Sequence, residues 1–281
     1  MEPMCITLNQ QLYKKYKNFF ELADECFELS NNVVIPALKA LNLKQDELSK
    51  YQFILGANFY KAQNSFLSIM YLCNEGLVGD AESLVRKLIE LAVTLKYISK
   101  DINNRIEKYL HHSALVNYDR LKKMEDKNFQ SAYSNKLVEE FKKLKPEIEY
   151  AYSEAKQFYR VDEKGEVSRK FLYNWSGKSL GEMAAKCGMP DEMLPYKLYC
   201  ERIHASVDDI PKYFDFKDFS FGPNVSVDDI PVTIIQAVRM YLLIVELVIS
   251  EFNLKLRDSL YFLKQHLESF KEFIMSGVQD S

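Results

Sequence analysis

The chain has 281 residues and a formal net charge of −3 at pH 7, from 37 Lys and Arg against 40 Asp and Glu. This balance excludes a protein that binds nucleic acid or anionic lipid through an overall basic charge. Apolar residues make up 47% of the sequence, which excludes a disordered chain, and the low counts of 9 glycines and 8 prolines disfavour turn-rich β folds and glycine-loop nucleotide binders.

The first part of the chain has helical periodicity nearly throughout. Apolar residues recur every three to four positions from Leu12 to Leu29, and Pro36 fits the first turn of a short helix. A long helix is expected from Asp46 to about Cys73. After a turn, Asp80 is the expected N-cap of the next helix, which is the most apolar of this half.

A strongly charged segment occupies residues 125–168, after a helix that Asp101 is expected to cap and that ends near Met124. Its alternating Glu and Lys residues predict a long exposed helix or helical hairpin, which Pro146 is expected to kink or break. A loop is expected at residues 161–167. The segment is therefore predicted to be a charged helical excursion from the domain.

The next part of the chain combines a helix start with an irregular region. Ser179 and Glu182 have the spacing of a capping box, and Gly188 fits the C-terminal end of the helix that they begin. A further helix starts near Tyr196. Residues 207–230 are then predicted to form an irregular aromatic loop without a convincing strand.

Two helices are predicted to close the chain, over Pro231–Asn253 and from Leu256 to about Met275. The first has the length and apolar character of a membrane span. It also contains Arg239 and Glu246, and charges near the centre of a span are costly. We therefore expect a buried core helix and no membrane association.

These elements predict an all-α protein, a single domain over residues 1–281 built as a bundle of about eight to ten helices. The first ten residues lack the basic and apolar regions of a secretory signal. The five cysteines are widely spaced without a C-x-x-C pair, as in a reducing compartment. We therefore expect a cytoplasmic protein, and nothing in the sequence calls for a cofactor.

The first candidate site lies on the helix after Asp80, where Arg86, Glu90 and Tyr97 fall on one side at about 100° per residue. Arg86 and Glu90 are four residues apart and can hold each other charged beside a pocket. Other polar residues share this side of the helix. The same spacing therefore also describes an ordinary solvated stripe.

His204 is the second candidate, because it ends an amphipathic helix and precedes an irregular loop. Glu201 stands three positions before it, the ligand spacing of di-iron bundles, but the chain lacks the second Glu-x-x-His that such a site needs. Cys200 and His204 with Cys187 begin a zinc set that still needs a distant fourth ligand. No metal site is therefore predicted, and His204 is either a catalytic or a structural histidine.

The third candidate is Arg105 with His111 and His112. This pattern resembles the R-x(4–6)-H signature of HEPN ribonucleases, helical bundles whose dimers form one metal-free RNA-cleaving site from two motifs. The resemblance implies a histidine acid/base and an arginine that stabilises the phosphorane. The sequence departs from that family at Ile106, where a polar residue is usual.

Three stretches, in order along the chain, resemble a mostly bacterial helical family known as domain of unknown function five-six-seven-seven. The resemblance covers roughly residues 51–254 and implies that the matching residues belong to one shared feature. It also associates the chain with genes found near phage-defence systems. The residues that carry the resemblance are Arg86, Glu90, Tyr97, Trp175, Gly177, Tyr199 and His204.

The leading hypothesis is a polar pocket that binds or cleaves a nucleotide or an RNA phosphodiester, with a role in phage defence. His204 would be the acid/base, Arg86 the anion contact and Glu90 the orienting group. Aromatic residues would supply the ligand-binding surface. These residues are Tyr97, Trp175 and Tyr199.

Two alternatives remain open. The first is a HEPN-like ribonuclease, a homodimer in which Arg105 acts with His111 or His112 on RNA. The second is a non-enzymatic scaffold or partner-binding protein, in which the charged excursion faces the partner.

Overall fold

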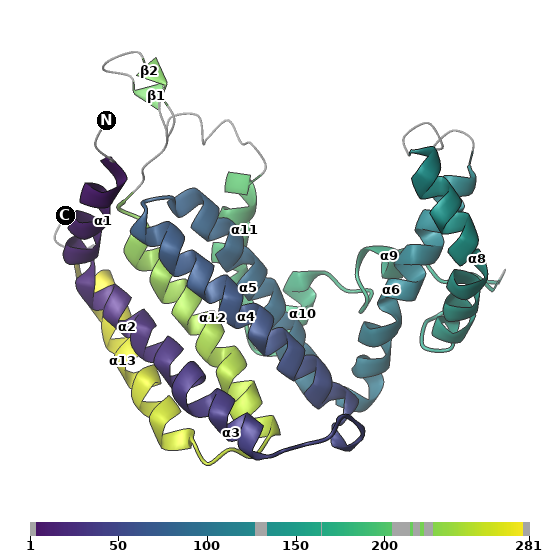
Figure 1. The fold of residues 1–281 in the computed structure, drawn as a ribbon, viewed down its shortest axis with the longest axis horizontal. Coiled ribbons are helices and arrows are strands. Elements are labelled where there is room, and N and C mark those ends of the chain that lie inside the picture. Colours follow the sequence, from purple (N-terminus) through teal and green to yellow (C-terminus); the bar gives the residue numbers. More distant parts are fainter. Residues whose placement is uncertain are drawn as a thin grey trace. The chain divides into compact units, whose positions relative to one another are not determined.

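The computed structural model describes residues 4–126, 134–163, 165–203, 214–215, 220–221 and 227–277. These residues are mainly helical (Figure 1), which confirms the all-α prediction. One element was not predicted: two short strands, β1 (Phe214–Asp215) and β2 (Ser220–Phe221), pair antiparallel. A ladder of two residues per strand does not change the fold class.

The chain divides into two compact units. The first unit consists of Met1–Lys96 and Ala184–Ser281, and the second of Tyr97–Met183. The single domain over residues 1–281 stays a prediction, because a division by contacts does not measure whether two units unfold together.

The first unit begins with a nearly continuous helical run. It comprises α1 (Met4–Lys15), α2 (Lys17–Glu28), a π-helix (Leu29–Val34) and α3 (Ile35–Ala40). The π-helix contains Ser30, whose buried hydroxyl accepts a 2.6 Å hydrogen bond from the hydroxyl of Tyr241. Because both groups lie in the core, this bond satisfies two hydroxyls that water does not reach.

The start of α4 (Lys50–Asn74) differs from the expected start at Asp46. A short 3-10 helix (Gln45–Glu47) comes first, and Ser49 is the N-cap. The Ser49 hydroxyl accepts from the backbone N–H of Gln52 at 3.0 Å, and the Gln52 side chain accepts from the N–H of Ser49 at 3.0 Å. This reciprocal capping box determines where the long helix begins.

Helix α5 (Val78–Ser99), which carries the first candidate site, also begins earlier than expected. The backbone carbonyl of Leu77 already accepts from the N–H of Ala81 at 3.1 Å, so Asp80 lies in the first turn and is not the N-cap. Its carboxylate there still complements the positive end of the helix dipole.

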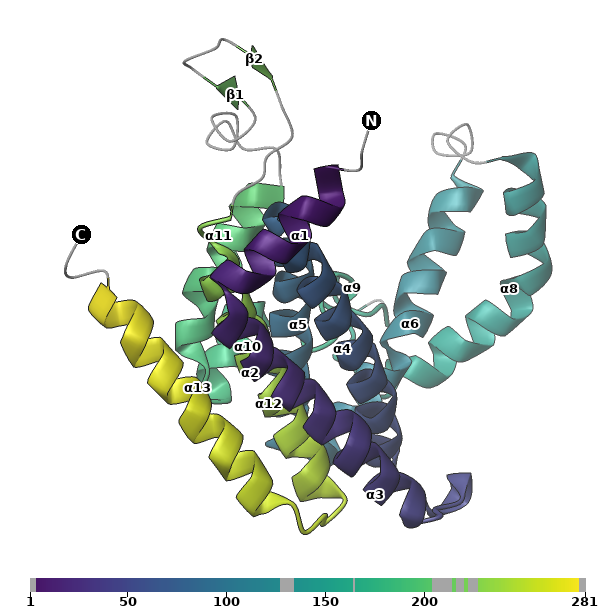
Figure 2. The same ribbon diagram turned by 60° about the vertical axis from the view of Figure 1, so that its left-hand side comes forward.

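Helix α12 (Ile230–Glu251) is long and apolar enough to cross a membrane by length and composition, but 78% of its apolar stretch is buried inside the structure. It packs against α2, α4 and α13 (Arg257–Gly277), as Figure 1 and Figure 2 show. This burial agrees with the predicted core helix.

Two of the charged residues of α12 have partners in neighbouring elements. Arg239 pairs with the buried carboxylate of Glu192 at 2.7 Å, and Glu246 pairs with Lys264 of α13 at 2.8 Å. These ion pairs explain how an otherwise apolar core helix accommodates its charges.

Residues 180–203 form three short helical elements. They are α10 (Leu180–Lys186), a 3-10 helix (Pro190–Glu192) and α11 (Met193–Ile203). The predicted capping box of α10 is confirmed, because the N–H of Glu182 donates to the Ser179 hydroxyl at 3.2 Å and the Glu182 carboxylate accepts from the N–H of Ser179 at 2.7 Å. Gly188 ends this turn at φ +77°, as its C-terminal position predicts.

The second unit is built on α6 (Ile102–Glu125) and α8 (Asn135–Lys156), which pack against each other. Pro146 lies inside α8 without breaking it, and Figure 2 shows one curved helix. The charged excursion thus contains one continuous helix, and Pro146 does not break it.

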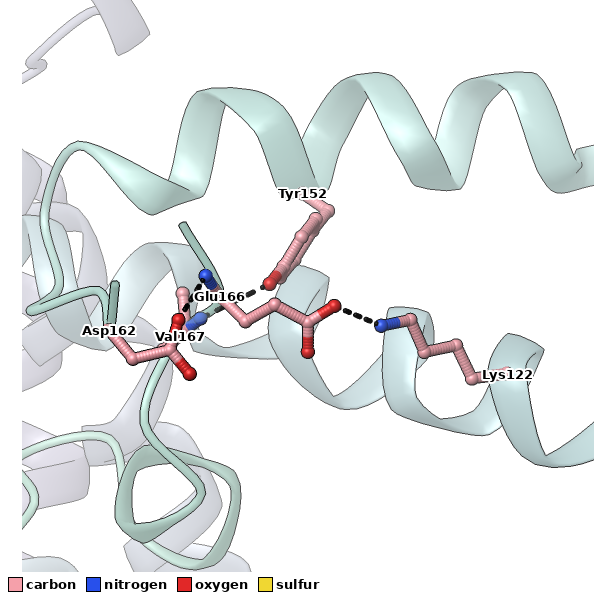
Figure 3. A network of polar contacts seen from close by, with 5 residues as sticks. All are labelled: Lys122, Tyr152, Asp162, Glu166 and Val167. Atoms are coloured by element: carbon pink, nitrogen blue, oxygen red, sulfur yellow. Dashed lines mark hydrogen bonds and ion pairs between the residues drawn. The ribbon is translucent and has the colours of Figure 1, made fainter. Parts of the chain in front are cut away.

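The loop predicted after α8 is a tight turn held against both helices (Figure 3). The N–H of Glu166 donates to the Asp162 carboxylate at 2.9 Å, and the Glu166 carboxylate pairs with Lys122 of α6 at 2.7 Å. The N–H of Val167 donates to the hydroxyl of Tyr152 in α8 at 3.3 Å. The turn leads into α9 (Lys170–Tyr173), at the edge of the core of this unit.

Candidate functional site

Two predicted residues, Arg86 and Glu90, lie on α5 in the first unit and share a partner on α11. Their side chains pair at 3.2 Å. The Tyr196 hydroxyl donates to the Glu90 carboxylate at 2.9 Å and accepts a longer, 3.5 Å hydrogen bond from Arg86. The Arg86 guanidinium also lies 5.4 Å from the centre of the Tyr196 ring. We call Arg86, Glu90 and Tyr196 the Arg86 cluster.

The Arg86 cluster lies at the surface and remains partly hydrated. The side chain of Arg86 is 25% exposed and that of Glu90 is 41% exposed. The Nε atom of Arg86 is nevertheless buried, and it has no hydrogen-bond partner among the residues that the structure describes. The guanidinium is therefore partly open to solvent, while one of its donors stays unsatisfied among the described residues.

The charge states in the Arg86 cluster follow from its contacts. The hydrogen bond with Tyr196 raises the pKa of Arg86, so the guanidinium stays charged. Burial raises the pKa of Tyr196 to about 12; the hydrogen bond with Arg86 opposes this increase, and those with Glu90 and Cys200 add to it. At neutral pH the cluster therefore contains a cation and a neutral phenol that acts as donor to a carboxylate.

Tyr199 also lies on α11 but on its buried side. It is 4% exposed, and burial raises the pKa of its hydroxyl. The nearby acidic groups of Asp229, Cys73 and Glu192 act in the same direction. Tyr199 is a core residue in this structure, and its role in ligand binding stays a prediction.

The other two aromatic candidates, Tyr97 and Trp175, pack together in the second unit. Their ring centroids are 5.9 Å apart, and they are 5% and 6% exposed. The guanidinium of Arg105 lies 3.8 Å from the centre of the Tyr97 ring and donates to the Tyr97 carbonyl oxygen. Trp175 also meets the ring of Tyr109 edge-on at 5.4 Å. These contacts join the start of α6 to the turn after α9, and a ligand-binding role for Tyr97 and Trp175 stays a prediction.

The two histidines of α6 have separate partners. Nε2 of His112 donates to the carbonyl oxygen of Phe171 at 2.8 Å, and burial lowers the pKa of His112. His111 stacks on Phe158 at 4.5 Å and lies 3.6 Å from Glu107. With Arg105 held at Tyr97, each residue of the HEPN-like pattern has a contact within its own unit. These contacts give the HEPN resemblance no support.

His204, the predicted acid/base, lies outside the described residues, which stop at residue 203 and resume at residue 214. The structure therefore brings together Arg86 and Glu90 of the predicted set. It adds a residue that the sequence analysis did not select, Tyr196.

Comparison with protein-family models matches residues 52–221 to a family of unknown function, DUF5677. The chain belongs to this family. Comparison with curated proteins and with solved structures finds no match. This match confirms the predicted resemblance over residues 52–221, whereas the sequence analysis extended it to about residue 254.

The DUF5677 segment contains every residue of the three candidate sites, and it excludes the whole N-terminal run from α1 to α3 and the last two helices. Within it, a spacing signal for Tyr196 was present in the sequence. Tyr196, Cys200 and His204 follow one another at four-residue intervals, which places them along one side of a helix that continues through them.

The structure also bears on the metal sets that the sequence left open. Within the described ranges, no three His, Cys, Asp or Glu side chains gather as a metal site would need. The zinc set with Cys187, Cys200 and His204 depends on a residue outside those ranges.

Proposed function

We propose that this DUF5677 protein binds a phosphate-bearing ligand, a nucleotide or an RNA phosphodiester, at the Arg86 cluster. The observation that carries the proposal is a guanidinium that is partly exposed at the surface and held in place by Tyr196 and Glu90. A planar guanidinium matches the geometry of phosphate oxygens better than any other side chain. Glu90 orients the guanidinium.

His204 is proposed as the acid/base, or as a hydrogen-bonding group to the ligand. The support is its spacing, since His204 follows Tyr196 by two helical turns in the sequence, at positions that share one side of a helix. An imidazole and a guanidinium together suit chemistry at a phosphodiester, because the imidazole can transfer a proton and the guanidinium can contact the anion. Binding through Arg86 does not require this second role.

The experiment is a titration with ATP and with a fluorescently labelled single-stranded RNA, using the full chain. Arg86→Gln should weaken binding about tenfold, because a charge-assisted hydrogen bond is lost. Lys87→Gln is the matched control, since Lys87 is the exposed neighbour of Arg86 on α5, and it should change affinity by less than about twofold. Equal effects of the two variants, or no binding by the wild type, would refute the proposal.

The acid/base role has its own test. His204→Ala should abolish RNA cleavage and leave the melting temperature unchanged. A large loss of thermal stability would identify His204 as a structural residue instead.

We also propose a cytoplasmic location and a role in phage defence. The free thiols support a reducing compartment, and they belong to Cys26, Cys73, Cys187 and Cys200. The defence role is supported by the family resemblance alone. It is tested by comparing phage plating on cells that express the wild type or Arg86→Gln.

A partner-binding role is the second candidate, favoured by three exposed aromatic residues on α4. Phe53, Tyr60 and Tyr71 are 52%, 42% and 72% exposed and fall on one side of the helix at about 100° per residue. Exposed aromatic side chains aligned in this way are typical of contact surfaces. A second copy of the chain is the simplest partner. Sedimentation velocity should then show a dimer that Tyr60→Glu dissociates, and a wild-type monomer would refute this candidate.

A further inference from the structure

A hollow opens between α12 and α13 in the first unit, outside the segment that matches the DUF5677 family. Its volume is about 340 Å³, within the range of small-molecule sites. Ile249 and Leu260 line it and are only 2% and 6% exposed, so they form an apolar floor. The hollow can therefore receive the apolar body of a small ligand.

The rim of this hollow is polar and carries a net positive charge. Lys264 and Glu246 line it as a pair at 2.8 Å, so their charges offset each other. Arg257 lines it too and makes no ion pair with any residue in the described part of the chain. Ser250 also lines the hollow. One uncompensated guanidinium therefore faces an apolar floor.

Other titratable groups nearby do not cancel this charge. Asp258 follows Arg257 and Glu251 follows Ser250 in the chain, but neither carboxylate lines the hollow. Burial raises the pKa of Glu251, whose side chain is not part of the lining of the hollow.

We propose that the hollow between α12 and α13 binds a small organic anion, a carboxylate or phosphate monoester with a short apolar body. Arg257 holds the anionic group through its planar donors. Ile249 and Leu260 contact the apolar body, whose burial adds to the affinity. This site is separate from the Arg86 cluster and does not depend on its function.

The test follows the methyl NMR signal of Ile249 in the full chain during titration with hexanoate, butyl phosphate and the neutral isostere hexanamide. Both anions should shift the signal in a saturable way, and hexanamide should bind about tenfold more weakly than hexanoate. Equal binding of hexanoate and hexanamide would overturn the proposal, because the site would then recognise only an apolar body.

Three variants complete the test. Arg257→Gln should weaken hexanoate binding about tenfold, whereas Lys255→Gln, an exposed cation that does not line the hollow, should leave it within about twofold. Ser250→Trp fills the hollow from an exposed position and should abolish the shift with all probes. Unchanged hexanoate binding by Arg257→Gln or by Ser250→Trp would place the ligand elsewhere and overturn the proposal.

Discussion

Gly177 is one of the residues that carry the family resemblance, and the structure explains why a side chain there should be costly. Its φ is +65°, a left-handed conformation that costs a residue with a Cβ about 1 kcal/mol. A Cβ at this position would also lie 2.5 Å from Cε1 of Phe171. Phe171 is 6% exposed and its ring meets that of Tyr159 edge-on at 5.1 Å, so it cannot move freely. Displacing a buried ring costs about 1–3 kcal/mol, which gives about 2–4 kcal/mol in all for Gly177→Ala.

Urea unfolding of Gly177→Ala measures this loss, and the chain offers a matched control. Gly165 has a similar φ of +72°, but a Cβ there would meet nothing within 4 Å. Gly165→Ala should therefore cost only the conformational part, about 1 kcal/mol. If the two variants lose the same free energy of unfolding, the close approach of Phe171 has no energetic weight and the reasoning is refuted.

Three further substitutions test polar contacts by urea unfolding. Tyr196→Phe removes the hydroxyl that links the Arg86 cluster and should cost about 0.5–1 kcal/mol, because the site is partly hydrated; no loss would show that water replaces the hydroxyl. Burial lowers the pKa of His112, so the unfolded chain takes up a proton more readily and stability should fall as the pH drops below about 6.5. His112→Gln can still donate to the Phe171 carbonyl and should flatten this pH dependence, and an unchanged slope would contradict the assignment. Glu192→Ala removes a buried carboxylate from Arg239, which is itself 37% exposed, and should cost about 2–3 kcal/mol; a loss below about 1 kcal/mol would show that solvent compensates.

Local sequence patterns predicted the ends of helices well where only one position fitted the pattern. The spacing of Ser179 and Glu182 located the start of α10, because both halves of a capping box lie within one turn. The predicted N-cap at Asp80 was wrong. The carbonyl of Leu77, three residues earlier, already accepts the first hydrogen bond of the helix, so the Asp80 side chain does not act as the cap. Such starts depend on the geometry of the preceding turn, which the sequence does not specify.

Only the part of the candidate site that lies on a single helix could be predicted from the sequence. Arg86 and Glu90 pair because residues four apart meet on a helix. Tyr196 stands 106 positions from Glu90, so no local periodicity connects them, and only the packing of α11 on α5 brings its hydroxyl to the pair. The contact of Arg105 with Tyr97 was hidden for a similar reason, because a turn separates the two helices that carry them.

Arg86, Glu90 and Tyr97 all carry the family resemblance and share α5, but their contacts differ, and this difference is testable. Arg86 and Glu90 bond to Tyr196, whereas the Tyr97 ring is 5% exposed and contacts Arg105 at 3.8 Å. Tyr97→Leu removes the ring contacts and leaves a gap, which should lower the free energy of unfolding by about 2–3 kcal/mol and leave ATP affinity within about twofold. Arg86→Gln should instead weaken ATP binding and leave the free energy of unfolding nearly unchanged, because the charge is at the surface and its loss creates no cavity. If Tyr97→Leu weakened ATP binding and left stability unchanged, Tyr97 would belong to the ligand site, as the family resemblance implies, and the division of the pattern into a binding part and a packing part would be wrong.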